Sequence, residues 1–449
     1  MMLTGPDAPR ADDLRLAPAN DAIRPGADEE ALTSSALEDV PARIRHLRLP
    51  ERASLIGMSA READLALLAT APVGYLDTTH FDTQRFPPPA WAIGAFSAAA
   101  EQGALAYTGY RGTEAVLQEL AASVGGFLGI PINPVSNLLL TPGTQAGLFT
   151  ALSALVGTGD RVALVDPDYL FTARIIRFLG GEIGHVPLDL REGDPSPDLE
   201  MLEAEFAQKG TRLLVFSHPN NPTGAVYSSA VIAGIAQLVL KYGVTVLVDE
   251  LYSRLIHEGP AFAHLAAQPG MAERVVTLLG PSKTESLSGY RLGVVVAPRA
   301  VAARIEDVLS ITSLRAPAYA QHVLLPWLRD DHEWLAQRLD SFRGLREQTL
   351  SSLRQLSWLE LQRQRGTAYA WVDVSALGLP GPAVAGALLR EAGVLVSPGY
   401  QFGPASDGHF RLCYARDEGE WAHALDRVVG VLDRFATQQG LAAGASGER

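Results

Sequence analysis

Short apolar runs alternate with helical patterns through the middle of the chain, and this alternation constrains the fold more than any other feature. The runs, rich in valine, isoleucine and leucine, end at or near 141, 166, 217, 250, 280 and 297. Segments with helical spacing of apolar residues separate several runs, and another precedes the first at 113–130. Short strands alternating with helices are typical of a mostly parallel sheet covered on both faces. The sequence therefore predicts an α/β fold.

The pattern changes after residue 300. An amphipathic stretch at about 331–355 predicts a helix that bridges two domains. Strand-like runs follow at 358–361, 368–374, 394–397 and 409–415, with a helix near 381–392, which indicates a smaller α+β domain. We expect a flexible N-terminal arm at 1–45, a segment at 46–110 that contributes to the small domain and a substrate loop, a large domain at 111–315 and the small domain at 316–440.

Composition excludes several classes of protein. A net charge of -13 repels phosphate backbones and argues against nucleic acid as a partner. The single cysteine, Cys413, cannot form an intrachain disulfide, and no Cys/His cluster suits a structural metal ion. The N-terminus lacks a signal-peptide pattern, and no apolar stretch reaches the ~20 residues that span a bilayer. We expect a cytoplasmic protein that binds neither metal nor membrane.

Only three lysines occur, so any chemistry that needs a primary amine has three candidates. Lys283 follows an apolar run, in GPSKTESLSGYRLG, whereas Lys209 and Lys241 precede runs. In open α/β sheets, ligands bind at the loops after the carboxyl ends of strands. A lysine placed there among apolar residues is expected to be nucleophilic, so Lys283 is the candidate.

Other strand-ending loops carry polar and aromatic groups. In TPGTQAGLF, the amides of a helix start and a hydroxyl, from Gly143, Thr144 and Gln145, form a candidate phosphate seat. Tyr169 follows the next run in DPDYL, and Asn221 lies in HPNNPTG. Each motif taken alone also fits an ordinary helix cap, packing aromatic or turn.

The last two loops add a carboxylate, hydroxyls and a cation. Asp249 and Tyr252 end the run VLVDELY, where a carboxylate after four apolar residues needs a cation or hydrogen bonds. Ser282 and Arg291 accompany the lysine. An amine, a carboxylate for a pyridine nitrogen and an anion seat are jointly the parts that hold pyridoxal 5'-phosphate.

The order and spacing of these motifs resemble the class I/II aminotransferases of fold type I over about residues 70–430. The resemblance implies that Lys283 is the Schiff-base lysine and moves a proton from the substrate Cα. It also implies that Asp249 pairs with the pyridinium, that Asn221 and Tyr252 hold the 3'-oxygen, and that Tyr169 stacks on the ring. The phosphate is implied to lie against Gly143, Thr144, Ser282 and Arg291.

Two further matches concern a partner subunit and the substrate. Tyr107, five residues before Gly112 in YTGYRGTEAVLQEL, is similar to the family's tyrosine that reaches the partner's phosphate, which implies a homodimer. Arg411 in GHFRLCYA follows VLVSPGYQFG and is similar to the arginine that binds the substrate α-carboxylate.

The chain departs from the family pattern at two places. Gly280 stands three residues before Lys283, where a hydroxyl residue is usual. The glycine-containing substrate loop is replaced by YLDTTHFDTQRFPPPAW, which offers His80 as a substrate-binding residue or second acid/base. A histidine in such a loop is more often an ordinary loop residue.

These observations predict transamination of an α-amino acid, with Lys283, Asp249 and Tyr252 as catalytic residues. The departures leave open pyridoxal-phosphate-dependent elimination or replacement, oxidative decarboxylation or cyclisation of a specialised amino acid. A regulator that uses this fold as a sensor would carry a basic winged-helix domain ahead of it, and residues 1–60 are too short and too mixed in charge for one. A catalytically silent homologue would not be expected to keep Lys283, Asp249 and Arg291.

Overall fold

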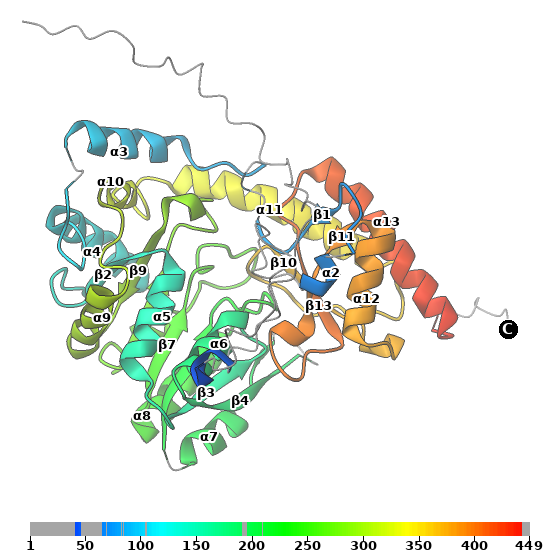
Figure 1. The fold of residues 1–449 in the computed structure, drawn as a ribbon, viewed down its shortest axis with the longest axis horizontal. Coiled ribbons are helices and arrows are strands. Elements are labelled where there is room, and N and C mark those ends of the chain that lie inside the picture. The colour runs from blue at the N-terminus through cyan, green and yellow to red at the C-terminus, as the bar shows by residue number, and fades with distance from the viewer. Residues whose placement is uncertain are drawn as a thin grey trace, which may run out of the picture.

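The protein has two lobes, with helix α11 (His332–Leu353) running across both (Figure 1). The computed structural model describes residues 41–45, 65–68, 70–81, 83, 85–103, 106–190, 195–208 and 210–441. Of the predicted arm at 1–45, all but the last five residues lie outside these ranges, so its flexibility stays a prediction. The short helices α1 (Ala42–Arg45) and α2 (Leu65–Leu68) precede the first strand.

The larger lobe is built on an eight-stranded sheet with the order β2-β9-β8-β7-β6-β3-β4-β5. Strands β3, β4, β6, β7 and β8 form the parallel pairs, whereas β2, β9 and β5 pair antiparallel with their neighbours. The predicted mostly parallel α/β sheet is therefore confirmed. The strand bounds are β2 (Leu138–Pro142), β3 (Arg161–Asp166), β4 (Glu182–Asp189), β5 (Ser196–Pro197), β6 (Thr211–Ser217), β7 (Thr245–Asp249), β8 (Val275–Leu279) and β9 (Leu292–Val296).

Helices cover both faces of this sheet. One face packs against α5 (Thr144–Leu155), α6 (Leu170–Phe178) and α9 (Arg299–Ile311). The other packs against α4 (Glu114–Leu128), α7 (Leu199–Ala207) and α8 (Ser229–Tyr242). Successive residues of a strand point to opposite faces, so Leu139 contacts the α5 cluster while Leu138 and Leu140 contact α4. This two-sided burial explains why most strands are apolar throughout.

The smaller lobe contains an antiparallel sheet with the order β10-β13-β12, formed by β10 (Tyr369–Asp373), β12 (Ser397–Pro398) and β13 (His409–Cys413). Strand β1 (Leu76–Asp77) pairs in parallel with β11 (Val394–Leu395), so part of the 46–110 segment lies against this lobe. Helices α11, α12 (Gly381–Ala387) and α13 (Glu418–Gln438) contact or cover these strands. The domain boundaries themselves stay predictions.

The predicted strand at 358–361 is wrong. These residues form a turn and an irregular segment after α11, and none of them pairs with a strand. Leu359 packs into the core of the smaller lobe while Glu360 faces solvent, so an apolar run is buried there without a neighbouring strand edge. Conversely, β4 was not predicted, because Gly184 and Pro187 interrupt its apolar residues.

The remaining elements are short or peripheral. Helix α3 (Ala90–Glu101) lies along one edge of the larger lobe, beside α10 (Ala318–Gln321) (Figure 1). Single 3-10 turns occur at Leu265–Ala267, Ser288–Tyr290, His322–Leu324, Ser375–Leu377 and Gly399–Gln401, and a π-helical turn at Leu388–Ala392 extends α12. Within the described residues, no helix is both long and apolar enough to cross a membrane.

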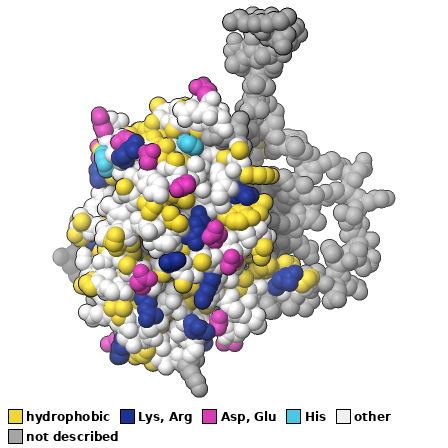
Figure 2. Space-filling view, turned by 90° about the vertical axis from the view of Figure 1, so that its left-hand side faces the viewer, with side chains coloured by type: hydrophobic (Ala, Val, Ile, Leu, Met, Phe, Trp, Pro, Cys, Tyr) yellow, Lys and Arg dark blue, Asp and Glu magenta, His cyan; other side chains and the backbone are white. Residues whose placement is uncertain are grey.

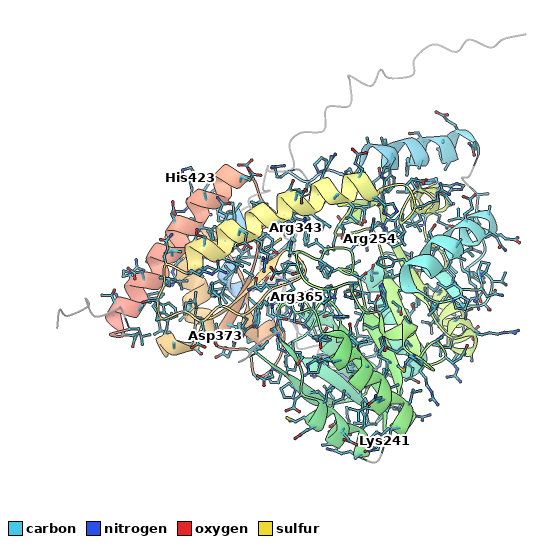
Figure 3. All side chains as sticks on the ribbon, turned by 180° about the vertical axis from the view of Figure 1, so that it is seen from behind. Lys241, Arg254, Arg343, Arg365, Asp373 and His423 are labelled. Carbon is cyan, nitrogen blue, oxygen red and sulfur yellow. The ribbon has the colours of Figure 1, made fainter. Side chains whose placement is uncertain are left out.

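A buried ionic cluster joins α11 to the larger lobe. Arg254, which follows β7, donates to Asp331 Oδ1 at 2.7 Å and also to Glu285. All three side chains are buried, and Figure 3 shows Arg254 beneath α11. Because Glu285 lies two residues after Lys283, the cluster fixes the segment that carries that lysine against the bridging helix. Such a pair is costly to break once buried, since removing one partner leaves an uncompensated charge.

Candidate active site

A cleft at the carboxyl ends of the central strands brings most of the predicted site residues together. Its walls come from the loops after β2, β3, β6, β7 and β8. The predicted residues that line it are Thr144, Gln145, Tyr169, Asn221, Asp249, Tyr252, Ser282, Lys283 and Arg291. Leu148, Ser217, Leu251 and Ser288 complete the lining. The convergence follows from the sheet, because parallel strands end at one edge.

One end of the cleft suits an anion. Helix α5 begins there at Thr144, and Gly143 before it has φ +84°. A Cβ on Gly143 would lie 2.3 Å from Arg291 Nη2, so only glycine lets the guanidinium approach the helix start so closely. Arg291 is oriented by donating to the carbonyls of Ser288 at 2.8 Å and Pro142 at 3.3 Å. Helix amides and a guanidinium aimed at one place can hold a phosphate dianion.

Asp249 lines another part of the cleft, where β7 ends. Burial, with a smaller contribution from neighbouring Glu250, raises the pKa of its carboxyl to about 6. The Leu251 N–H, which donates to Oδ1 at 3.1 Å, and the charge of Lys283 act in the other direction. A buried carboxylate in this state is stabilised by any cation placed against it. A protonated pyridine nitrogen is such a cation, so this end of the cleft fits the ring of pyridoxal 5'-phosphate.

Lys283 lines the same cleft, in an aromatic setting. Its Nζ is 5.4 Å from the centroid of the Phe81 ring. On the other side of the cleft, the Tyr169 hydroxyl donates to Gln145 Oε1 at 3.0 Å, which fixes the tyrosine ring in the wall. Lys241, by contrast, lies on α8 at the outer edge of the molecule (Figure 3), ion-paired with Glu203. Lys209 falls outside the described residues.

Arg411 does not itself line the cleft, but from the smaller lobe it contacts Asn221, which does. Strand β13 is the middle strand of its sheet, and the Arg411 side chain is fully buried. Its Nη1 donates to Asn221 Oδ1 at 2.6 Å and its Nη2 donates to the Thr79 carbonyl at 2.7 Å. Asn221 belongs to the larger lobe, where the Ser217 hydroxyl accepts from its backbone N–H at 3.0 Å. The guanidinium is therefore held at the junction of the two lobes.

The structure does not bring His80 or Tyr107 into this cleft. The His80 side chain is 58% exposed, and its Nδ1 lies 3.4 Å from Asp77 Oδ2. The next residue, Phe81, is buried, and its ring stacks with that of Tyr252. Tyr107 is 89% exposed, and Arg315 lies over its ring at 4.8 Å. The roles of both residues stay predictions.

Sequence reasoning missed Asp168 and Tyr369. Asp168 is buried and accepts hydrogen bonds from the backbone of Ser217 at 2.7 Å and of Tyr169 at 2.6 Å. Burial raises the pKa of Asp168 to about 7 despite these bonds. Its position before Tyr169 in DPDYL was a usable signal. Tyr369 OH lies 2.9 Å from Tyr252 OH, and nothing in the local sequence indicates this contact across the lobes.

The glycine at position 280 has a steric explanation. A Cβ on Gly280 would lie 2.7 Å from Thr144 Oγ1 and 3.2 Å from the Leu292 carbonyl oxygen. The first residue of α5 therefore occupies the space that a side chain at 280 would need. Thr144 supplies a hydroxyl in this region from the other side of the cleft.

Comparison with known proteins gives a consistent result. The family model for aminotransferase class I and II matches residues 77–428. The aspartate/prephenate aminotransferase of Thermus thermophilus is 30% identical over 336 residues, covering 74% of this chain and 85% of that protein. The aspartate aminotransferase of Musicola paradisiaca is 28% identical over 353 residues, or 78% and 86% of the two chains. A solved aspartate aminotransferase from Rhodobacter sphaeroides is 38% identical with a TM-score of 0.78, covering 81% and 95%.

We expect Gly280→Ser to weaken the binding of pyridoxal 5'-phosphate about tenfold, although it adds a hydroxyl, because the new side chain must displace Thr144. Titration of the apoprotein with the cofactor, followed by absorbance, measures this. Gly289→Ser is the matched control, since a Cβ there meets nothing within 4 Å. A Gly280→Ser variant that binds the cofactor as tightly as the wild type contradicts the steric explanation.

Proposed function

Since this chain belongs to the class I and II aminotransferases, enzymes that use pyridoxal 5'-phosphate to transfer the amino group of an amino acid, we propose that the cleft beside Lys283 is its active site. The observation that carries the proposal is that Lys283, the candidate anion seat and the partly buried carboxylate of Asp249 line the same cleft. Both lobes contribute, because Arg411 of the smaller lobe donates to Asn221 of the cleft wall. Each residue role below is part of the proposal.

The cofactor would be held at three points. The start of α5 at Thr144, together with Ser282 and Arg291, would bind its phosphate, and Asp249 would pair with its ring nitrogen. Tyr169 would pack against the ring face, and Asn221 and Tyr252 would hydrogen-bond the 3'-oxygen. When bound, this group supplies an electron sink that stabilises negative charge at the substrate Cα.

The protein's own part in the reaction is to orient the substrate and move a proton. Arg411 would bind the substrate α-carboxylate with two parallel hydrogen bonds, which fixes the rotation about the Cα–N bond. Lys283 Nζ would then take the proton from Cα, since it is the only amine among the cleft residues. The ring of Phe81 beside it limits access of water to Nζ.

Replacing Lys283 by alanine should remove both the near-visible absorbance of the loaded protein and its activity, the latter by ~10³-fold or more, because no other cleft residue offers an amine. Absorbance spectra and a coupled assay of keto-acid formation with a panel of amino acids, aspartate included, measure these effects. Lys241→Ala is the control, since that lysine lies on the outer surface.

The same panel separates transamination from the other reactions. Formation of a keto acid together with an aminated acceptor supports the proposal. Release of ammonia or carbon dioxide, or a cyclised product, with no aminated acceptor from any donor, would instead mean elimination, decarboxylation or cyclisation.

The pH dependence of cofactor binding should report on Asp249. Its raised pKa, about 6, means that the carboxyl is ionised above pH 6 and neutral below it. Pairing with a ring-nitrogen proton needs the ionised form, so affinity should fall as the pH drops through 6. In Asp249→Asn the pairing is absent at every pH, so the ratio of the two dissociation constants should be large at pH 8 and shrink towards one below pH 6. A ratio independent of pH contradicts this role.

We also propose a homodimer in the cytoplasm. Large apolar side chains are exposed on and near α3, α9 and α10, among them Ile93, Tyr107, Ile311 and Tyr319. Figure 2 shows the side of the molecule on which α3 and α4 lie, with apolar groups spread among charges of both signs. A partner subunit that covers this side would bury them.

The cytoplasmic location rests on the lone Cys413, which is buried and unpaired, and cell fractionation checks it.

Sedimentation of the cofactor-loaded protein should give a dimer. Tyr107→Phe should lower the affinity for the cofactor several-fold while the protein remains a dimer. The reason is that this exposed tyrosine would bond the phosphate held by the partner subunit. Tyr319→Phe, another partly exposed tyrosine, serves as the comparison. A monomer with full activity overturns the assignment of Tyr107.

A further inference from the structure

Tyr369 contacts two of the proposed active-site residues at once. It lies at the start of β10 with its side chain fully buried. Its hydroxyl is 2.9 Å from the hydroxyl of Tyr252, and its ring centroid is 3.9 Å from the guanidinium carbon of Arg411. One side chain thus connects the residue proposed to hold the 3'-oxygen with the residue proposed to bind the carboxylate.

The ring of Tyr369 supports the guanidinium face of Arg411. The hydrogen bonds to Asn221 and to the Thr79 carbonyl fix this guanidinium within its own plane. They do not prevent it from tilting out of that plane. The stacked Tyr369 ring, together with Phe402 at 4.8 Å, opposes this tilt and attracts the cation. A two-pronged carboxylate contact requires a defined plane, so the ring bears on substrate binding.

The hydroxyl of Tyr369, in contrast, forms a hydrogen bond with the hydroxyl of Tyr252. A tyrosine hydroxyl carries one proton, so if Tyr252 donates to the 3'-oxygen, it must accept from Tyr369. The pair is enclosed by Phe81, whose ring centroid is 6.2 Å from that of Tyr252 and 5.7 Å from that of Tyr369. In such dry surroundings, a donated hydrogen bond makes the accepting hydroxyl a stronger donor in turn.

We propose that Tyr369 is a positioning residue with two separable effects: its ring holds Arg411 in the plane needed for the α-carboxylate, and its hydroxyl directs the Tyr252 proton towards the cofactor. This inference rests on the roles given above to Arg411 and Tyr252. The two effects belong to different atoms, so two substitutions can separate them.

Tyr369→Phe keeps the ring and removes the hydroxyl. Tyr252 then donates more weakly to the 3'-oxygen, so the deprotonated form of the cofactor's 3'-oxygen is less stabilised. The loaded protein therefore loses its proton at a higher pH. We expect the pH at which the near-visible absorbance of the loaded protein changes to rise by about half a unit to one unit. The affinity for a carboxylate probe should stay within about twofold of the wild type. The probe is the deaminated analogue of the best donor, succinate if that donor is aspartate.

Tyr369→Leu removes the ring as well. We expect the dissociation constant of the same probe, and KM for the donor, to rise about tenfold. Circular dichroism and the melting temperature show whether this variant folds, and Tyr369→Phe tests the hydroxyl effect in either case.

Tyr414→Phe is the matched control. Its hydroxyl is also buried, 2.9 Å from His257 Nε2 and 2.9 Å from the Thr367 carbonyl oxygen. These hydrogen-bond partners differ from Tyr252 and Arg411, the residues that Tyr369 contacts. It should lose stability as Tyr369→Phe does, with no shift in the absorbance titration. Equal shifts in both variants would show a general packing effect and overturn the proposal.

The reference variants Tyr252→Phe and Arg411→Lys distinguish the two levels of inference. If they shift the absorbance titration and the probe affinity, respectively, while the Tyr369 variants do neither, Tyr369 has no positioning role. If the reference variants themselves change nothing, the proposed roles of Tyr252 and Arg411 fail first.

Discussion

The hydrogen bond from Arg411 to Asn221 is the contact on which the proposed substrate-binding position depends. Arg411 comes from the smaller lobe and Asn221 from the turn after β6 in the larger one. Asn221 is itself fixed through Ser217, and the backbone of Ser217 donates to Asp168. Burying a guanidinium is costly unless its donors are satisfied. The position of this cation is therefore set jointly by both lobes, and neither forms the site alone.

Two carboxyls at or near the cleft, that of buried Asp168 and that of partly buried Asp249, have raised pKa values of about 7 and about 6, and their surroundings differ. Asp168 receives bonds from the backbones of Ser217 and Tyr169, which positions the loops after β3 and β6. Asp249 receives one backbone bond, from Leu251, and lines the cleft. The first is well placed to organise the protein, and the second to meet a bound cation.

The site residues of the larger lobe could be predicted because they lie in loops that directly follow strands. Apolar runs mark those strands, parallel pairing brings their ends to one edge, and the residues that follow, such as Lys283 and Asp249, must then meet. The smaller lobe and the loops obey no such rule. His80 and Phe81 are neighbours in an irregular loop, and no periodicity indicates which one points inward. Tyr369 lies in a recognisable strand, yet its contact with Tyr252 depends on how the lobes are placed.

The outward position of Lys241 also affects where reactive carbonyl compounds can react with the protein. With three lysines in the whole chain and Lys283 inside the cleft, the described exterior carries this one primary amine, and Glu203 is paired with it. Arginine supplies the other strong cations, and its guanidinium stays protonated and so is a poor nucleophile. Free aldehydes, including unbound vitamin B6 aldehydes, therefore find few primary amines on the surface. The amine they would react with instead is that of Lys283 in the cleft.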